Sequence, residues 1–230
     1  MKNRRLLSAE EIDNILGQHK RSLEEYIKPY FRMGTDPIAK NIYLVYDGDD
    51  IYIELKNGRN RGLCCTENGY IYLRTDVDLV PSLLIHEFIH RLSRNRKFIK
   101  RHLKWEWVCG IDFPRKGIFY LNEAITEMIA IDITGTCEDG HPYRPGVEIV
   151  EKLCNTIGKN DLITAYFNGD ISFFKRRLGR YYKSFTYTFF HMMYFWFKLN
   201  SLGPETSDIS DIKEYCGAKS DLNLIISRLS

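Results

Sequence analysis

The sequence LLIHEFIH, residues 83–90, places two histidines four positions apart and a glutamate directly after the first. At 3.6 residues per turn, His86 and His90 share one stripe of a helix, so both imidazoles can reach a single zinc ion. Glu87 projects to the side, where it can contact a zinc-bound water without ligating the metal. The pattern H-E-x-x-H therefore predicts two metal ligands and a general base.

The alternative is a chance occurrence of this pattern on an ordinary buried helix. The preceding segment LVPSLLI carries no charge, and a broad apolar face continues through Phe88, Ile89 and Leu92. Burying ionisable side chains in such a helix is costly unless a partner compensates them. We therefore favour the metal site, which requires a third protein ligand because catalytic zinc usually has three.

A second segment, YLNEAITEMIAIDI at residues 120–133, offers that ligand. Glu123 and Glu127 are four positions apart and share one stripe of a predicted helix whose other residues are largely apolar. An exposed acidic edge is the alternative explanation for this pair. Two carboxylates on a largely buried helix indicate a compensating cation, which the histidine pair would help to bind.

HEFIH followed by NEAITE resembles the gluzincin metallopeptidases, the group that includes thermolysin and anthrax lethal factor. The resemblance covers two helices, about 30 of the 230 residues. It implies that Glu123 is the third ligand of one zinc ion and that Glu127 hydrogen-bonds a ligand histidine. The segment GKNDLITAYFNGDISFFKRRLG also resembles uncharacterised bacterial proteins with the same two motifs, but it does not indicate a substrate.

The resemblance implies metal-assisted hydrolysis, in which zinc activates a water and Glu87 transfers its proton to the leaving amine. Gluzincins add a side chain that stabilises the oxyanion. Tyr143 and His191 are the leading candidates for that role. His141, Tyr120 and Tyr187 are weaker ones, and each of these residues has an alternative explanation as a core or turn residue.

The expected fold class is α+β, in a single zincin-like domain over residues 1–230 with its sheet at about 40–75 and helices over 76–230. NIYLVY and IYIELK flank one turn signal, and GLCCT and YIYLRT flank Glu67-Asn68-Gly69, which predicts a sheet of about four strands. Before the sheet, Ser8 and Glu11 predict a capping box for a helix that Pro29 ends or kinks.

For the helical part, Asp76 or Asp78 is expected to cap the H-E-x-x-H helix, with Pro81 in its first turn. A polar connection is expected from about Asn95 to Lys116, and the second motif helix is expected to start near Asn122. Further helices are predicted near Pro145, Asp161, Ile171 and Phe185, and a short one near the end of the chain.

Composition limits the function classes. The net charge of +3 is small and gives no reason to expect nucleic acid as a partner. The basic and aromatic stretch at residues 176–199 can also indicate single-strand binding, but its aromatics follow the spacing of a packed core helix. Its 15-residue apolar part is short for a membrane span. No secretory signal is evident, so we expect a cytoplasmic location, with secretion that needs no signal as the alternative. The six cysteines include no C-x-x-C pair, and we expect them to be reduced thiols.

The leading hypothesis is a zinc endopeptidase acting on protein or peptide substrates. A regulatory protease of a mobile element and a secreted effector are related alternatives, although no helix-turn-helix supports the first. A zinc amidase or esterase acting on a small molecule is a further alternative. A non-enzymatic metal-binding protein fits least well, because a structural site has no use for Glu87.

Overall fold

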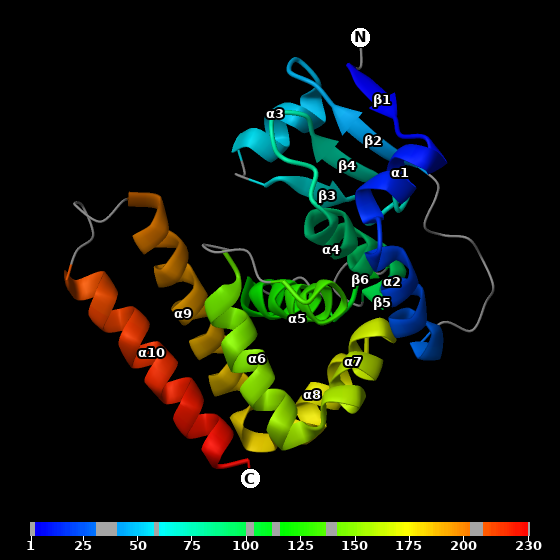
Figure 1. Ribbon diagram of the computed structural model, residues 1–230. Helices are drawn as coiled ribbons and strands as arrows, with labels where there is room; N and C mark the ends of the chain where they lie inside the picture. The colour runs from blue at the N-terminus through cyan, green and yellow to red at the C-terminus, as the bar shows by residue number, and fades with distance from the viewer. Residues whose placement is uncertain are drawn as a thin grey trace. The chain divides into compact units, whose positions relative to one another are not determined.

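The computed structural model describes residues 3–30, 41–57, 60–99, 104–111, 116–136, 142–202 and 209–229. The chain divides into two compact units, Met1–Cys109 with Ile129–Thr136 and Gly110–Met128 with Cys137–Ser230. A four-stranded sheet, a two-stranded sheet and many helices make up the described residues (Figure 1), which confirms the expected α+β class. The expectation of a single domain stays a prediction.

The first unit contains a mixed four-stranded sheet with the order β1-β2-β4-β3 (Figure 1). The two central strands run parallel, and each edge strand runs antiparallel to its neighbour. The strands are β1 Arg4–Leu6, β2 Ile42–Val45, β3 Gly62–Cys64 and β4 Ile71–Arg74. Three of the four expected strands are therefore confirmed, and so is the hairpin that joins β3 to β4.

The remaining expected strand, IYIELK, is a helix in the structure. Helix α3 (Asp50–Asn57) follows Asp49, whose carboxylate accepts a hydrogen bond at 2.9 Å from the backbone N–H two residues later and so caps the helix. Helical spacing buries Tyr52 and Leu55, whereas Ile53 is 46% exposed. A strand would have placed Ile53 and Leu55 on the same face. The prediction was wrong because IYIELK fits both periodicities and Asp49 decides between them.

Strand β1 occupies the edge position beside β2, and an ion pair holds it there. The Arg4 guanidinium donates to both carboxylate oxygens of Asp49, each at 3.0 Å. The Asp49 side chain is fully buried and that of Arg4 is 16% exposed. Asp49 therefore both starts α3 and fixes a strand whose basic sequence gives no strand signal.

The expected first helix is two helices in the structure. Their bounds, with the 3-10 helix that follows, are α1 Ala9–Leu16, α2 His19–Ile27 and η1 Lys28–Tyr30. The capping box of Ser8 and Glu11 is confirmed by reciprocal hydrogen bonds of 3.1 and 2.9 Å. Gly17 breaks the helix by adopting a φ of 51°, which glycine tolerates best. Pro29 lies in η1, just after α2 ends.

Helix α4 (Pro81–Leu92) carries the H-E-x-x-H motif and packs against β3 and β4. Pro81 is its first residue as expected, but neither expected aspartate caps it. The N-cap is Val80 in an extended conformation, with no side-chain hydrogen bond. Asp76 instead accepts two hydrogen bonds from Arg74, at 2.9 and 2.6 Å, which lower the pKa of the Asp76 carboxyl.

A two-stranded sheet replaces much of the expected polar connection after α4. Strand β5 (Arg94–Ile99) pairs antiparallel with β6 (Lys104–Cys109) over six residue pairs. The prediction was wrong here because the β5 sequence RNRKFI is too polar to give a strand signal. Cross-strand contacts between arginines and tryptophans compensate.

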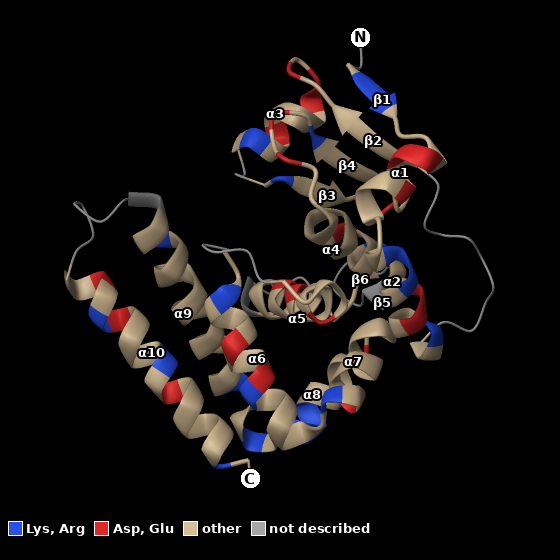
Figure 2. Cartoon of the chain, viewed as in Figure 1, with Lys and Arg blue, Asp and Glu red and all other residues tan. Residues whose placement is uncertain are grey.

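The second unit is helical. Helix α5 contributes its part up to Met128 to this unit and its last residues to the first. Helices α9 and α10 lie side by side, and α6 packs on both (Figure 1). Figure 2 shows that α9 carries little charge, whereas α10 carries both signs. The helices are α5 Lys116–Thr134, α6 Arg144–Ile157, α7 Lys159–Phe167, α8 Ile171–Leu178, the 3-10 helix η2 Gly179–Tyr181, α9 Tyr182–Leu202 and α10 Ile209–Ser227.

Most of these helices begin near the expected positions, with two differences. Helix α5 starts at Lys116, six residues before the predicted start at Asn122. Helix α10 has 19 residues and is not the short element expected near the end. In the described parts of the chain, no helix is both long and apolar enough to cross a membrane, as expected.

The ion pair between Arg4 and Asp49 gives a first prediction. Asp49→Ala should lower the free energy of unfolding by about 3–5 kcal/mol, because it leaves a mostly buried guanidinium without its partner and removes the cap of α3. Urea unfolding followed by circular dichroism measures the change. Glu25→Ala, which breaks the exposed pair between Arg21 and Glu25, is the matched control and should leave stability unchanged. Equal losses in the two variants would contradict this account.

Candidate metal centre

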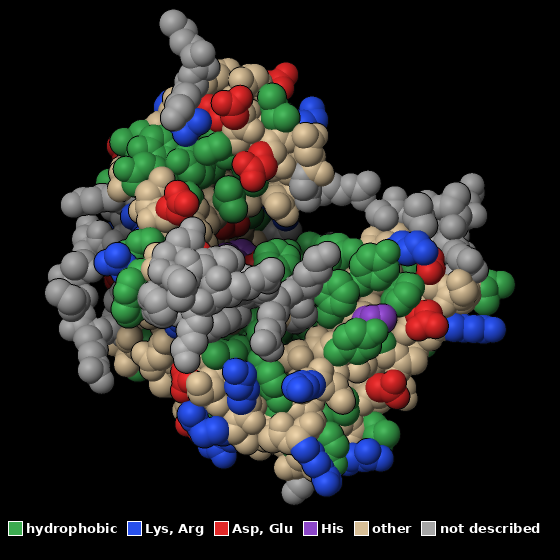
Figure 3. Space-filling model, turned by 180° about the vertical axis from the view of Figure 1, so that it is seen from behind, with side chains coloured by type: hydrophobic (Ala, Val, Ile, Leu, Met, Phe, Trp, Pro, Cys, Tyr) green, Lys and Arg blue, Asp and Glu red, His purple; other side chains and the backbone are tan. Residues whose placement is uncertain are grey.

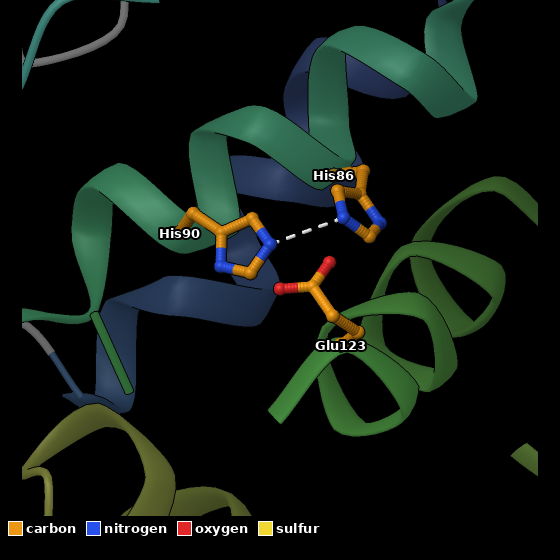
Figure 4. Close-up of side chains that lie close together, drawn as sticks. All are labelled: His86, His90 and Glu123. Atoms are coloured by element: carbon orange, nitrogen blue, oxygen red, sulfur yellow. Dashed lines mark hydrogen bonds between the residues drawn. The ribbon is translucent and has the colours of Figure 1, made fainter. Parts of the chain in front are cut away.

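Helix α4 presents its two histidines to the same point. The Nε2 atoms of His86 and His90 lie 3.1 Å apart, and both side chains are buried (Figure 4). One turn of helix separates the residues, and the ring planes meet at 72°. Two nitrogen ligands at about 2.0–2.1 Å from a tetrahedral zinc ion would lie about 3.3 Å apart. The observed separation of the two nitrogens is therefore close to the one that a shared zinc ion requires.

Helix α5 supplies a carboxylate at the same point. Glu123 is buried, and its carboxylate lies beside the two imidazoles in Figure 4. The ligand atoms of His86, His90 and Glu123 all lie within 4.8 Å of one another. In the described residues, this is the one group of three or more His, Cys, Asp or Glu side chains with ligand atoms so close. Two neutral imidazoles and one carboxylate form a donor set suited to a divalent metal such as zinc.

The expected general base lies next to this group on α4. Glu87 is 5% exposed and packs against strand β3. A Cβ atom on Gly62 would lie 2.9 Å from Glu87 Oε1 and 3.1 Å from its Cγ. The Glu87 carboxylate therefore fits against bare backbone, and a larger residue at position 62 would displace it. Sequence reasoning did not identify Gly62. The one indication in the sequence is that this glycine stands at the start of a predicted strand.

The second carboxylate of α5 is also buried. Glu127 is 3% exposed and lies one turn after Glu123. Of the two carboxylates, Glu123 is the one grouped with the histidines. A hydrogen bond from a ligand histidine to Glu127 stays a prediction.

The middle of α5 is anchored by a buried polar cluster that sequence reasoning missed. Asn122 accepts a hydrogen bond from the Ile111 N–H at 3.0 Å, and the hydroxyls of Thr126 and Tyr166 lie 2.6 Å apart. Gly110 has a φ of 57°, and a Cβ atom there would lie 2.3 Å from Asn122 Oδ1 and 2.4 Å from a carbon of the Tyr166 ring. These contacts fix the turn of α5 that carries the adjacent Glu123.

Two cysteines of the first unit also lie near α4. Cys64 in β3 and Cys109 in β6 are buried free thiols. A hydrogen bond between them, together with burial, raises the pKa of the Cys64 thiol. The five cysteines in the described residues form no disulfide.

The candidate oxyanion stabilisers lie in the second unit. Tyr143 is half-buried at the start of α6, with its ring edge on Phe197 at a centroid distance of 5.6 Å. Tyr120 stacks on Phe197 at 5.4 Å, and its partial burial raises the pKa of its hydroxyl. These contacts are also typical of core packing, so an oxyanion role for either tyrosine stays a prediction.

The histidine candidate lies on α9. The His191 ring is half-buried, 4.3 Å from that of Tyr187, which is 64% exposed. Figure 3 shows that hydrophobic side chains gather on one face of the molecule. An oxyanion role for His191 or Tyr187 also stays a prediction. The remaining candidate, His141, lies outside the described residues.

No protein-family model, curated protein or solved structure matches this chain. The interpretation of the site therefore rests on its own residues and their geometry.

The geometry separates the roles of the two carboxylates on α5. Glu123→Ala should lose most of the bound zinc, because it removes one of three ligands. Glu127→Ala should keep the zinc with affinity weakened about 10- to 100-fold, the usual effect of losing a residue that orients a ligand. Metal content after dialysis and competition with a fluorescent chelator measure both effects. If Glu127→Ala empties the site and Glu123→Ala does not, the assignment of the ligand is wrong.

The anchor of α5 gives a prediction with a matched control. Gly110→Ala should destabilise the protein by about 1–2 kcal/mol from backbone strain, and by about 1–3 kcal/mol more because the new methyl group overlaps Asn122 and Tyr166. Gly179→Ala is the control, because Gly179 has a similar φ of 49° but nothing within 4 Å of an added Cβ. Denaturant unfolding measures the loss of unfolding free energy in each variant, and the difference between the two losses is the cost of the overlap. The account of the anchor is wrong if the two substitutions cost the same.

Proposed function

We propose that this chain is a zinc-dependent hydrolase that cleaves peptide bonds. The observation that carries the proposal is the convergence of His86, His90 and Glu123 beside the buried Glu87. The three-residue set leaves a coordination position open for water or substrate, as catalytic zinc sites do. Structural zinc sites instead use four protein ligands, usually with cysteines.

A bound zinc ion would lower the pKa of a water molecule at the site and polarise the scissile carbonyl. The two imidazoles and the Glu123 carboxylate would hold the ion. Glu87 accepts the proton of the attacking water and delivers it to the leaving nitrogen. Its packing against Gly62 fixes the carboxylate and limits its contact with solvent.

The position of β3 favours a peptide substrate over a small molecule. β3 is an edge strand, and no strand pairs with its outer side in the residues that the structure describes. An extended peptide can add to such an edge through main-chain hydrogen bonds. Because Gly62 of β3 contacts Glu87, a peptide on this edge would run beside the general base. A zinc amidase or esterase is the second candidate, and it lacks an observation of this kind.

Glu87→Gln tests the proposal. Glutamine has nearly the shape of glutamate but cannot accept the proton, so hydrolysis should fall by about 10²–10⁴-fold. Zinc content should stay unchanged, and the variant should be no less stable than the wild type, because a buried charge is removed. The wild type and the variant, both zinc-loaded, are incubated with a peptide library at neutral pH, and cleavage is read by mass spectrometry.

The control is the double variant His86→Ala, His90→Ala, which should lose both zinc and activity. Equal cleavage by the wild type and Glu87→Gln would rule out Glu87 as the base. Absence of cleavage by the zinc-loaded wild type, combined with turnover of small amides or esters, would favour the second candidate.

A further inference from the structure

One short segment, from the end of α4 to the first residue of β6 in the β5–β6 hairpin, is strongly basic. Residues 91–104, RLSRNRKFIKRHLK, contain seven Lys or Arg and no Asp or Glu. The whole chain has 33 Lys and Arg against 30 Asp and Glu, so the rest of the chain is net acidic. Such asymmetry indicates an anionic partner for this segment. The segment includes β5, the polar strand that sequence reasoning interpreted as a connection.

The same hairpin exposes two tryptophans. Trp105 and Trp107 are 58% and 43% exposed, although tryptophan is usually well buried. They are two residues apart on β6, so both point to one face of the two-stranded sheet. Arg96 pairs directly with Trp107 across the strands and is itself exposed. This face therefore alternates aromatic and basic side chains.

Cation–π contacts hold the two rings in place. The Arg94 guanidinium lies 4.6 Å from the centre of the Trp107 ring, and that of Arg96 lies 6.0 Å from the Trp105 ring. Arg94 also donates to the carbonyl oxygens of Thr66 and Glu67, at 2.9 and 2.8 Å. The rings are thus exposed on an ordered surface that is tied to the β3–β4 turn.

We propose that this face of the β5–β6 hairpin docks on the surface of an anionic phospholipid bilayer. Tryptophan is enriched at membrane interfaces, where the ring lies at the level of the headgroups, and basic side chains bind the phosphates of anionic lipids. A single-stranded nucleic acid would need open ring faces for its bases to stack. Here a guanidinium lies over each indole ring and occupies one of its faces, and the two tryptophans and Arg96 remain exposed. This arrangement suits headgroups better than bases.

The protein contains three tryptophans, and two are in this hairpin, so fluorescence can report docking directly. Trp196→Phe leaves Trp105 and Trp107 as the only reporters. This variant is titrated with vesicles of phosphatidylcholine alone and with vesicles containing about one third phosphatidylserine. We expect a blue shift and co-sedimentation with the anionic vesicles only, both weakened at high salt. Lack of binding to the anionic vesicles would overturn the proposal.

Two variants then test the surface in the otherwise native chain by co-sedimentation. Arg96→Glu changes the charge by two and should weaken binding about 30-fold, because each basic residue near an anionic surface contributes about a fivefold effect. The double variant Trp105→Ala, Trp107→Ala should weaken it at least tenfold. Arg180→Glu, an equally large charge change at an exposed residue of the second unit, is the control and should bind as the wild type does.

Thermal unfolding followed by circular dichroism should show that each variant is folded at the temperature of the binding assay, with a lower melting temperature for the two hairpin variants because they lose Arg–Trp contacts. Wild-type vesicle binding by Arg96→Glu and by the tryptophan variant would overturn the proposal. So would tighter binding to a single-stranded oligonucleotide that is lost with the two tryptophans, since this would favour nucleic acid. The double variant His86→Ala, His90→Ala should bind vesicles normally, so the outcome is independent of the proposed hydrolase.

Discussion

The burial of two imidazoles and a carboxylate on α4 is the constraint on which the rest of this structure depends. A helix packed against a sheet normally buries apolar side chains, and each unpaired ionisable group there is costly. The Nε2 atoms of the two histidines lie 3.1 Å apart, so one imidazole can donate a hydrogen bond to the other. The nearby Glu123 adds a second buried carboxylate to that of Glu87. A divalent cation at this point would accept the lone pairs of both imidazoles and offset the negative charge of the buried carboxylates.

Two glycines let the backbone lie directly against side chains around the site, and these contacts hold the side chains in position. Gly62 lets β3 lie against the Glu87 carboxylate, and Gly110 lets its own backbone lie against Asn122 and Tyr166. In both places an added Cβ would come within 3.0 Å of a neighbour. Backbone has far less freedom than a flexible side chain, so these contacts hold the neighbouring groups in one position. A site that must bring together groups from two helices needs this kind of support.

The hairpin after α4 combines structural and surface roles in the same residues. Arg94 ties β5 to the β3–β4 turn through two carbonyl groups and also contacts the Trp107 ring. The charge that makes the hairpin a candidate docking surface is therefore also part of what keeps it folded. Because the β3–β4 turn follows the edge strand that packs on Glu87, a bilayer bound at this hairpin would hold the first unit in a defined orientation at the surface. The docking surface and helix α4, which carries His86, Glu87 and His90, would then belong to the same unit.

The sequence by itself determined the features that depend on local spacing. The four-residue separation of His86 and His90 fixed their common stripe, and the capping box and most helices followed from periodicity and caps. The tertiary structure decided which distant groups meet: spacing put Glu123 and Glu127 on one stripe of a helix, and the structure groups Glu123 with the histidines. It also made IYIELK a helix through Asp49 and paired a polar segment into a strand. The physical reason is that short segments satisfy more than one periodicity, and that contacts between residues far apart in the chain are set by packing, which no local pattern records.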